Sequence, residues 1–319
     1  MTIKRWLNVI VPPEDLNEID SVEVNVMNTS FYIAISNEYN TNWKETILSF
    51  LQYMEREFSR FLSNNELSRL NEAKRDSIIV VSPILFDILK KAEEYRLKTE
   101  DRFSPYLLIR LEVHGYKQSF PFEVAQHEET IPRFKNEDKP LIFTEGYQVM
   151  KKTDQKVDLG GIAKGYAVEA ISKWLQNHTR STYGIVDGGG DMAMWSKGDK
   201  AWTIGIRDPF YEEIEIGSFS IRNGGVATSN TIYRSWLQGE TKKHHILDGR
   251  TGMPTVSEVV QATVVTERCL DAEISAKLFF MDDVTTVKSV LSNINRKFSY
   301  VLVESNGKIE IGGSRENEH

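Results

Sequence analysis

The sequence predicts an α+β fold in which mixed or antiparallel sheets pack against helices as two closely joined lobes. Short segments of alternating apolar residues indicate strands, and longer segments with apolar residues at helical spacing indicate amphipathic helices. The chain has 319 residues, more than the roughly 250 to 300 at which a single hydrophobic core stops growing. We therefore expect residues 1–319 to form one domain with two sub-lobes.

The composition favours an enzyme with a small anionic ligand over a nucleic-acid-binding protein. Hydrophobic residues make up 40% of the chain and charged residues 27%, which are ordinary proportions for a globular protein. The formal net charge is -7, and Lys and Arg are scattered, whereas binding to a phosphate backbone needs a concentrated basic surface. We expect no nucleic-acid partner.

The single cysteine and the first residues bear on location. Cys269 can form no intrachain disulfide, and a lone cysteine is most often a small buried apolar side chain. Residues 1–15 hold one short apolar run before Pro12 and Pro13, which is too interrupted for a secretory signal. No segment approaches the roughly 20 apolar residues of a membrane span. We expect a cytoplasmic protein without a membrane span.

The first predicted elements are strands followed by a long helix. Apolar residues alternate with polar ones over 22–26 and again over 31–35, which predicts a strand pair or one bent strand. Asn42 and Glu45 have the spacing of a capping box, and apolar residues at helical spacing continue through Phe61. These patterns predict a long amphipathic helix.

Two shorter helices are predicted next, before a stretch without a regular pattern. Ser63 and Glu66 repeat the capping-box spacing, and Ser82 followed by Pro83 is a typical helix start. Residues 107–143 contain prolines and charges with no sustained period. We expect irregular strands and loops there, bridging the two lobes.

The second half of the chain is predicted to contain short strands between helices. A helix is expected after Gly161 and continues to about Asn177, with apolar residues along one face. Strands are predicted over residues 183–187, 202–206, 214–221 and 259–265. Helices over residues 271–281 and 283–294 precede a final hairpin of residues 300–303 and 309–311.

Three glycine clusters mark positions where the backbone can approach a ligand closely. Gly160 and Gly161 precede a predicted helix, whose free N–H groups and positive dipole end favour an anion such as a pyrophosphate. Lys164, one turn further on, can reach the same anion. Taken alone, these glycines are explained more simply by a tight strand-to-helix turn. Residues 188–190 fit a hairpin turn, and residues 224–230 offer hydroxyls and amides that can bind a ligand or cap backbone.

Two further pairs of side chains can carry chemistry. Asp271 and Ser275 are four residues apart in a predicted helix, so they can converge on one ion. A carboxylate, a hydroxyl and backbone carbonyls suit magnesium better than zinc, although Asp271 equally suits a helix N-terminus. His244 and His245 are neighbours in an extended segment and face opposite sides, so one of them can line a site as a general base or donor. A structural role for both is the alternative.

Taken in order, these segments resemble the ApbE-type family of FAD:protein FMN transferases over nearly the whole chain. The most specific segment, residues 157–167, is similar to the family signature almost residue for residue. The other similar segments are Met27-Asn28-Thr29, residues 58–71, Gly189-Gly190-Asp191, Ala227-Thr228-Ser229, residues 245–252, and Asp271-Ala272 with Ser275. The resemblance implies an ApbE-like, T-fold-like architecture.

The resemblance also implies a reaction. A Thr or Ser hydroxyl of an acceptor protein would attack the FMN phosphorus of FAD, with AMP leaving and Mg²⁺ bound. The implied contacts with FAD come from Met27 and Phe61 at the isoalloxazine, Phe103 and Ser104 beside the flavin, and Asp158, Lys164 and His245. The implied metal ligands are the Gly161 carbonyl, Asp271 and Ser275, and the implied catalytic groups are His245 and Lys164. A metal that neutralises phosphate oxygens and a base that takes the hydroxyl proton are suited to this chemistry.

The chain departs from the family pattern at several positions. Asn28 replaces the Gly of Met-Gly-Thr, Ser104 replaces the Asp of Phe-Asp-Pro, and Asn230 replaces a Gly after Thr-Ser. Gly249 replaces a Pro, and Ser275 replaces a Thr but keeps the hydroxyl. Ser104 removes a carboxylate from the flavin pocket, and Asn28 adds bulk next to the ring. Two alternatives therefore stand beside the transferase: a non-catalytic flavin-binding protein on the same fold, and a hydrolase that splits FAD into FMN and AMP.

Overall fold

A large antiparallel sheet forms the centre of the molecule. The computed structural model describes residues 3–4, 8–11, 19–36, 42–122 and 137–314. The sheet has eight strands in the order β19-β18-β17-β12-β9-β8-β4-β3, and each neighbouring pair is antiparallel. Its strands are β3 (Ile19–Val26), β4 (Thr29–Ser36), β8 (Tyr183–Gly188), β9 (Asp191–Ser196), β12 (Gly224–Asn230), β17 (Val259–Thr266), β18 (Phe298–Glu304) and β19 (Ile309–Gly313). The predicted α+β class is confirmed.

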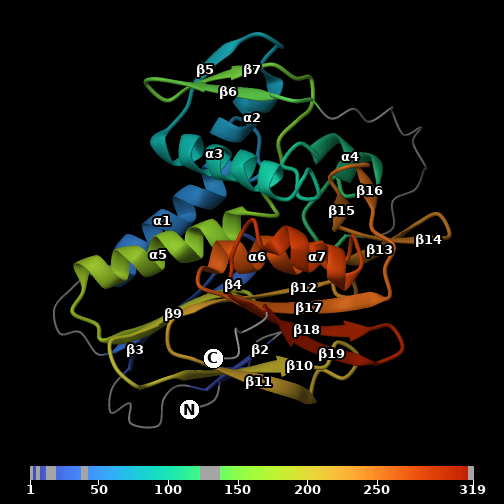
Figure 1. The fold of residues 1–319 in the computed structure, drawn as a ribbon. Helices are drawn as coiled ribbons and strands as arrows, with labels where there is room; N and C mark the ends of the chain where they lie inside the picture. The colour runs from blue at the N-terminus through green and yellow to red at the C-terminus, as the bar shows by residue number, and fades with distance from the viewer. Residues whose placement is uncertain (1–2, 5–7, 12–18, 37–41, 123–136, 315–319) are drawn as a thin grey trace.

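Helices cover one face of this sheet, and a second sheet covers the other (Figure 1). The helices are α1 (Trp43–Phe58), α2 (Glu66–Glu72), α3 (Pro83–Lys98), α4 (Leu108–Val113), α5 (Ala163–His178), α6 (Cys269–Leu278) and α7 (Val284–Leu291). The second sheet has the order β1-β2-β10-β11 and comprises β1 (Ile3–Lys4), β2 (Asn8–Val11), β10 (Trp202–Arg207) and β11 (Glu215–Ile221). The smaller sheets are β5 (Ile78–Val80), β6 (Leu141–Thr144) and β7 (Gln148–Lys151), then β13 (Ser235–Gln238) with β14 (Thr241–His244), and β15 (Leu247–Asp248) with β16 (Met253–Pro254).

Strand β4 shows how the layers share the core. Phe31 and Ile33 pack in the cluster between the large sheet and the helices, whereas Tyr32 and Ala34 pack in the cluster between the two sheets. Successive side chains of a strand point to opposite faces, so a strand that is covered on both faces needs apolar residues throughout. Cys269 is buried in the helix-side cluster, as expected for a lone cysteine.

The long helix α1 confirms one prediction and corrects two. It ends at Phe58 because Ser59 has extended backbone, so Phe61 lies beyond the helix rather than on its apolar stripe. Asn42 is the N-cap residue, but its side chain makes no capping hydrogen bond, and the capping box predicted with Glu45 is absent. The backbone of Asn42 (φ -77°, ψ 38°) is not in the extended region that N-cap residues typically adopt.

The cap of α2 is also displaced from its prediction. The structure places Asn65, not Ser63, at the N-cap, with extended backbone. Asn65 Oδ1 accepts from the Ser68 N–H at 2.8 Å, and Ser68 Oγ accepts from the Asn65 N–H at 2.9 Å. A capping box therefore forms between Asn65 and Ser68, two residues after the predicted pair of Ser63 and Glu66. Ser82 caps α3 as predicted.

The segment 107–143 is more regular than predicted. Helix α4 lies within it, so the expectation of irregular strands and loops is wrong for residues 108–113, and strand β6 begins near its end, at Leu141. Residues 123–136, with Pro132, lie outside the described residues, as do Pro12 and Pro13. The role of this segment as a bridge between two lobes stays a prediction. Over the described ranges, no helix has the length and apolarity to cross a membrane.

Strands β9 and β12 were not predicted. Each begins next to a glycine cluster, and the left-handed φ values of Gly189 (79°) and Gly190 (100°) form the turn from β8 to β9. The hairpin interpretation of residues 188–190 is therefore confirmed. Helices α6 and α7 end at Leu278 and Leu291, each three residues before the predicted limit.

Candidate active site

The turn between β3 and β4 holds Met27 and Asn28. Both residues have φ 55°, in a two-residue hairpin loop between the paired residues Val26 and Thr29. Left-handed backbone is accessible to Gly and Asn but strained for Met. Asn28 therefore fits a position where the family has Gly, and its Nδ2 donates to the Phe120 carbonyl at 2.9 Å. The Met27 N–H donates to Glu55 Oε1 at 2.8 Å, which helps to hold the strained turn.

Asp158 and Phe61 meet through Arg60, a residue that the sequence did not single out. Arg60 Nε lies 3.2 Å from Asp158 Oδ1, and its guanidinium lies 4.4 Å from the Phe61 ring centroid and 4.3 Å from that of Tyr116. Burial raises the pKa of Asp158, and the Arg60 charge opposes that rise. The Phe61 side chain is 37% exposed, so part of its ring is open to a ligand.

The start of α5 is bonded to the protein itself. Three N–H groups expected to be free here have partners, so that expectation is wrong for them: those of Ile162, Ala163 and Gly165. The partner of the Gly165 N–H is Glu273 Oε2 of α6, at 3.0 Å. A Cβ at Gly165 would lie 2.5 Å from that oxygen, so the close approach of α6 requires glycine.

Lys164 lies at the same junction. Its ammonium pairs with Asp191 at the start of β9 and lies 3.6 Å from Glu273 Oε1. Burial lowers its pKa, which the Glu273 charge opposes. The side chain is 19% exposed, so the ammonium remains partly accessible to an anion. Lys164 thus adds an ammonium to the start of α5, where several amides already bond within the protein.

The predicted metal ligands Asp271 and Ser275 are both buried in α6, one turn apart. Asp271 Oδ1 accepts from the Tyr95 hydroxyl at 2.5 Å and Oδ2 from Asn295 at 3.4 Å. Burial raises the pKa of Asp271, which the Tyr95 hydrogen bond opposes. Asp271 also lies in the first turn of α6, where a carboxylate is favoured by the helix dipole. The alternative role predicted for it, at the helix N-terminus, is therefore confirmed.

Ser275 provides the test of whether a metal fits. Its buried Oγ has no hydrogen-bond partner among the described residues, and a buried hydroxyl without a partner is costly. An unpaired hydroxyl one turn from a carboxylate fits an oxygen-ligated cation such as Mg²⁺. In the described part of the chain, no three His, Cys, Asp or Glu side chains are arranged so that they could hold a metal ion.

His245 and His244 have different environments, as expected for neighbours in an extended segment. His245 Nδ1 lies 3.4 Å from the Arg234 carbonyl, and His244 Nε2 lies 3.1 Å from the Thr255 carbonyl. Burial and the Arg234 charge hold the pKa of His245 well below its usual 6.5, so the ring is neutral at pH 7 and can accept a proton. Arg234 Nη2 donates to the Asn28 carbonyl at 3.2 Å, which links this histidine to the Met27 turn.

Phe103 and Ser104 are buried rather than open to solvent. A Cβ at Gly161 would lie 3.4 Å from Phe103 Cε2, so Phe103 lies beside Gly161. Ser104 packs on Gly249, where a Cβ would lie 2.7 Å from the Ser104 Cβ and closer still to the Asp101 carbonyl. Two departures from the family pattern, at 104 and 249, are therefore in contact.

Asn230 has a structural role. Its Oδ1 accepts from the N–H groups of Ile232 and Tyr233, and its Nδ2 donates to Gln261. The side chain therefore shapes the end of β12.

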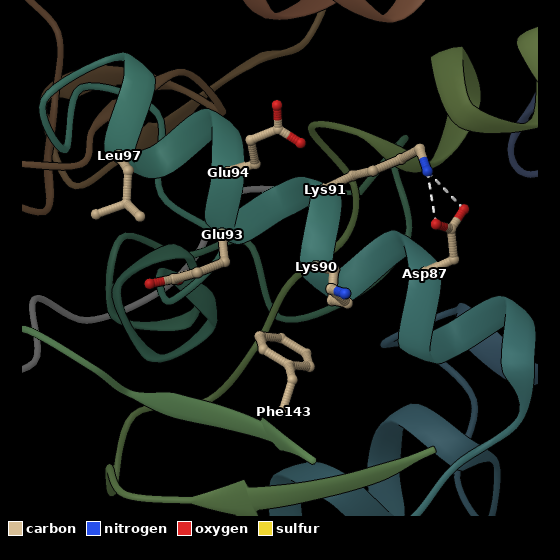
Figure 2. A pocket seen from close by; sticks show the side chains of 7 residues that line it. All are labelled: Asp87, Lys90, Lys91, Glu93, Glu94, Leu97 and Phe143. Carbon is tan, nitrogen blue, oxygen red and sulfur yellow. Dashed lines mark hydrogen bonds and ion pairs between the residues drawn. The ribbon is translucent and has the colours of Figure 1, made fainter. Parts of the chain in front are cut away.

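A separate pocket lies outside this region. It measures about 500 Å³ and lies along α3 near Phe143 (Figure 2). Its lining includes none of the predicted site residues. Figure 2 shows Lys91 directed at Asp87, to which it donates at 2.6 and 2.7 Å. The pocket is therefore separate from the junction of α5 and α6, where the predicted site residues lie.

The fold and the site define an α+β protein with a candidate phosphate and metal site. The site lies between the glycine-rich start of α5 and the buried pair of Asp271 and Ser275 on α6. The sequence profile of the ApbE family matches residues 27–302. The chain belongs to the ApbE family.

Related proteins agree in sequence and in fold. A Klebsiella pneumoniae protein named FAD:protein FMN transferase is 26% identical over 224 residues, 68% of each chain. A Treponema pallidum protein of the same name is 25% identical over 256 residues, 74% of this chain and 70% of its own. The crystal structure of an ApbE protein from Thermotoga maritima has a TM-score of 0.78 at 24% identity and covers 92% of this chain and 97% of its own. The flavin transferase ApbE from Vibrio cholerae has a TM-score of 0.72 at 20% identity, covering 93% and 97%.

Proposed function

We propose that this protein is a magnesium-dependent FAD:protein FMN transferase, which moves FMN from FAD to a Thr or Ser hydroxyl of an acceptor protein and releases AMP. Membership of the ApbE family and the names of its relatives support this reaction. The observation that carries it is the place of His245, whose Nδ1 lies 3.4 Å from the Arg234 carbonyl and whose pKa is lowered by burial and by the Arg234 charge. A proton acceptor beside positive charges suits attack of a hydroxyl on a phosphate.

Each site residue has a proposed part. His245 takes the proton of the acceptor hydroxyl, and Lys164 offsets the charge of the phosphate oxygens. Met27 and Phe61 flank the isoalloxazine. Asp158, which is paired with Arg60, contacts the cofactor. Phe103 and Ser104, which are buried, support the flavin from inside the protein. The burial of Phe103 and Ser104 favours a role in shaping the pocket wall.

A magnesium ion would be held by the Gly161 carbonyl, Asp271 and Ser275, and it would supply neutralisation of the pyrophosphate oxygens. The unpaired Ser275 hydroxyl is the structural feature that supports this assignment. Tyr95 and Asn295 hold the Asp271 carboxylate in place, as outer hydrogen-bond partners of metal ligands commonly do.

One assay separates the transferase from its two alternatives. The protein is incubated with FAD, Mg²⁺ and a flavin-acceptor domain, and the products are examined for in-gel flavin fluorescence and released AMP. Covalent labelling with AMP release supports the transferase. AMP without labelling identifies an FAD hydrolase. Stoichiometric FAD binding without AMP overturns both enzymatic functions and leaves a flavin-binding protein.

A further inference from the structure

Helix α6 carries a buried ion pair to which the proposed reaction assigns no part. Lys277 Nζ lies 2.9 Å from the Glu273 carbonyl oxygen and 3.4 Å from Glu273 Oε1. Pairs at this i, i+4 spacing are usually solvated on a helix surface. Here the Glu273 side chain is only 1% exposed and that of Lys277 16%, because both point to the start of α5.

Glu273 is shared between two ammonium groups. Its Oε2 accepts from the Gly165 N–H, and its Oε1 makes no hydrogen bond and lies 3.6 Å from Lys164 and 3.4 Å from Lys277. An ammonium has three N–H donors. Among the described residues, the Glu273 carbonyl oxygen accepts the hydrogen bond of Lys277, and Oε1 is an ion-pair partner only. This partly exposed ammonium therefore keeps N–H donors for a ligand.

Lys277 also lies where the phosphates of FAD are proposed to bind. Its Cε is 3.6 Å from the position that a Cβ on Gly161 would take. Its charge contributes to the lowered pKa values of both His245 and Lys164. The side chain of Lys277 is therefore beside Gly161, and its ammonium shares Glu273 Oε1 with Lys164.

We propose that Lys277 binds a pyrophosphate oxygen of FAD, as a second ammonium beside Lys164. This inference rests on the proposed function, because it takes FAD as the ligand. The competing role for Lys277 is only to neutralise the buried charge of Glu273.

Affinity measurements on the full chain with Mg²⁺ separate these roles. Isothermal titration calorimetry is carried out with FAD, with ADP, which has the phosphates but no flavin, and with riboflavin, which has no phosphate. The variants are Lys277→Met and the double variant Glu273→Gln/Lys277→Met, in which no buried carboxylate is left unpaired. Lys173→Met is the matched control, because Lys173 also makes an i, i+4 pair, with Glu169 on α5, but its own side chain is exposed.

We expect both Lys277 variants to bind FAD and ADP at least about 10-fold more weakly, since a hydrogen bond between charged groups is lost. Riboflavin affinity and the control stay unchanged. Restoration of FAD and ADP affinity in the double variant would show that Lys277 only balances Glu273 and would overturn the inference. Unchanged ADP affinity in Lys277→Met, or an equal loss for riboflavin, would overturn it too.

The wild-type titrations test the proposed function independently. Wild-type protein that fails to bind FAD contradicts the flavin transferase, whereas the ADP titrations still decide whether Lys277 is a phosphate ligand. If the wild-type protein binds FAD and the Lys277 variants bind ADP normally, the proposed function stands. Only the inference about Lys277 is then overturned.

Discussion

The two ends of the candidate site are built in different ways. At the phosphate end, α5 and α6 meet through buried charged groups, and Glu273 contacts Gly165, Lys164 and Lys277 at once. At the ring end, Phe61 is partly exposed beside Arg60, and Met27 lies in a strained turn. The phosphate end is thus preorganised by contacts between helices, whereas the ring end depends on a hairpin loop and an aromatic side chain outside any helix. Preorganised charge suits a phosphate, whose position must be fixed for reaction.

The strongest test of the phosphate end is His245→Asn. Loss of the proton acceptor is expected to slow FMN transfer by about 100- to 10,000-fold at pH 7. The rate of fluorescent labelling of an acceptor domain measures the effect. His244→Asn is the matched control, because His244 bonds to the Thr255 carbonyl and has no part in the reaction. An equal loss in both variants would contradict the assignment.

The pH profile gives a second measurement of the same residue. A base works only when it is unprotonated, and the pKa of His245 is lowered well below 6.5 by burial and nearby cations. The acidic limb of kcat/KM is therefore expected to have its midpoint below pH 6.5, with no loss of rate as the pH falls from 8 to 6.5. A midpoint above pH 6.5 would exclude His245 as the base.

Asp271→Ala is expected to reduce magnesium-dependent transfer by more than roughly 100-fold. Changes at residues that only hydrogen-bond to a metal ligand cost up to that much, and Asp271 is proposed to be a ligand itself. Titration of activity with Mg²⁺ and a circular dichroism spectrum measure the loss and the retained fold. Tyr95→Phe is the control, because it removes the hydrogen bond to Asp271 but keeps the carboxylate. Full activity of Asp271→Ala would refute the metal site.

At the ring end, Asn28→Ala is expected to lower the free energy of unfolding by about 1 to 2 kcal/mol, because Ala is disfavoured at φ 55°. Asn28→Gly is expected to cost less, since Gly adopts this backbone freely. Urea denaturation of both variants measures the difference. If the two are equally stable, the left-handed turn does not determine which residue is tolerated at position 28.

Phe61→Ala is expected to have the smallest effect. Loss of one aromatic contact, worth about 0.5 to 1.5 kcal/mol, weakens FAD binding by about 2- to 10-fold. ADP, which lacks the flavin, is expected to bind unchanged. Leu62→Ala is a suitable control, because Leu62 is the exposed neighbour of Phe61. A parallel loss of ADP affinity would show that the two ends of the site are not separate.

Much of the fold follows from local patterns. The strand pair before residue 36, helices α1, α3, α5, α6 and α7 and the final hairpin agree with the predictions within a few residues. Strands β9 and β12 were missed because they are covered on both faces and begin at glycines, so they lack the alternation that identifies a half-buried strand. Helix α4 was missed because its six residues are too few to show a period.

The caps of α1 and α2 show why local spacing is not sufficient. Ser63 and Asn65 both offer a side chain that can cap, and the sequence spacing favoured Ser63. Asn65 was selected in the structure, where its Nδ2 donates to the Ser59 carbonyl at 2.7 Å, beyond the end of α1. That choice depends on how the chain leaves α1, which the capping pattern does not contain.

By itself, the sequence determined the class of fold, the periodic elements and the order of the segments that identify the family, because these depend on residues close together in the chain. Only the tertiary structure placed Glu273 against Gly165 across 108 positions, paired Arg60 with Asp158, and brought Lys277 beside Gly161. It also gave partners to three of the amides expected to be free at the start of α5. Partners of buried charges are selected by the packing of whole helices, which minimises unpaired polar groups over the entire core.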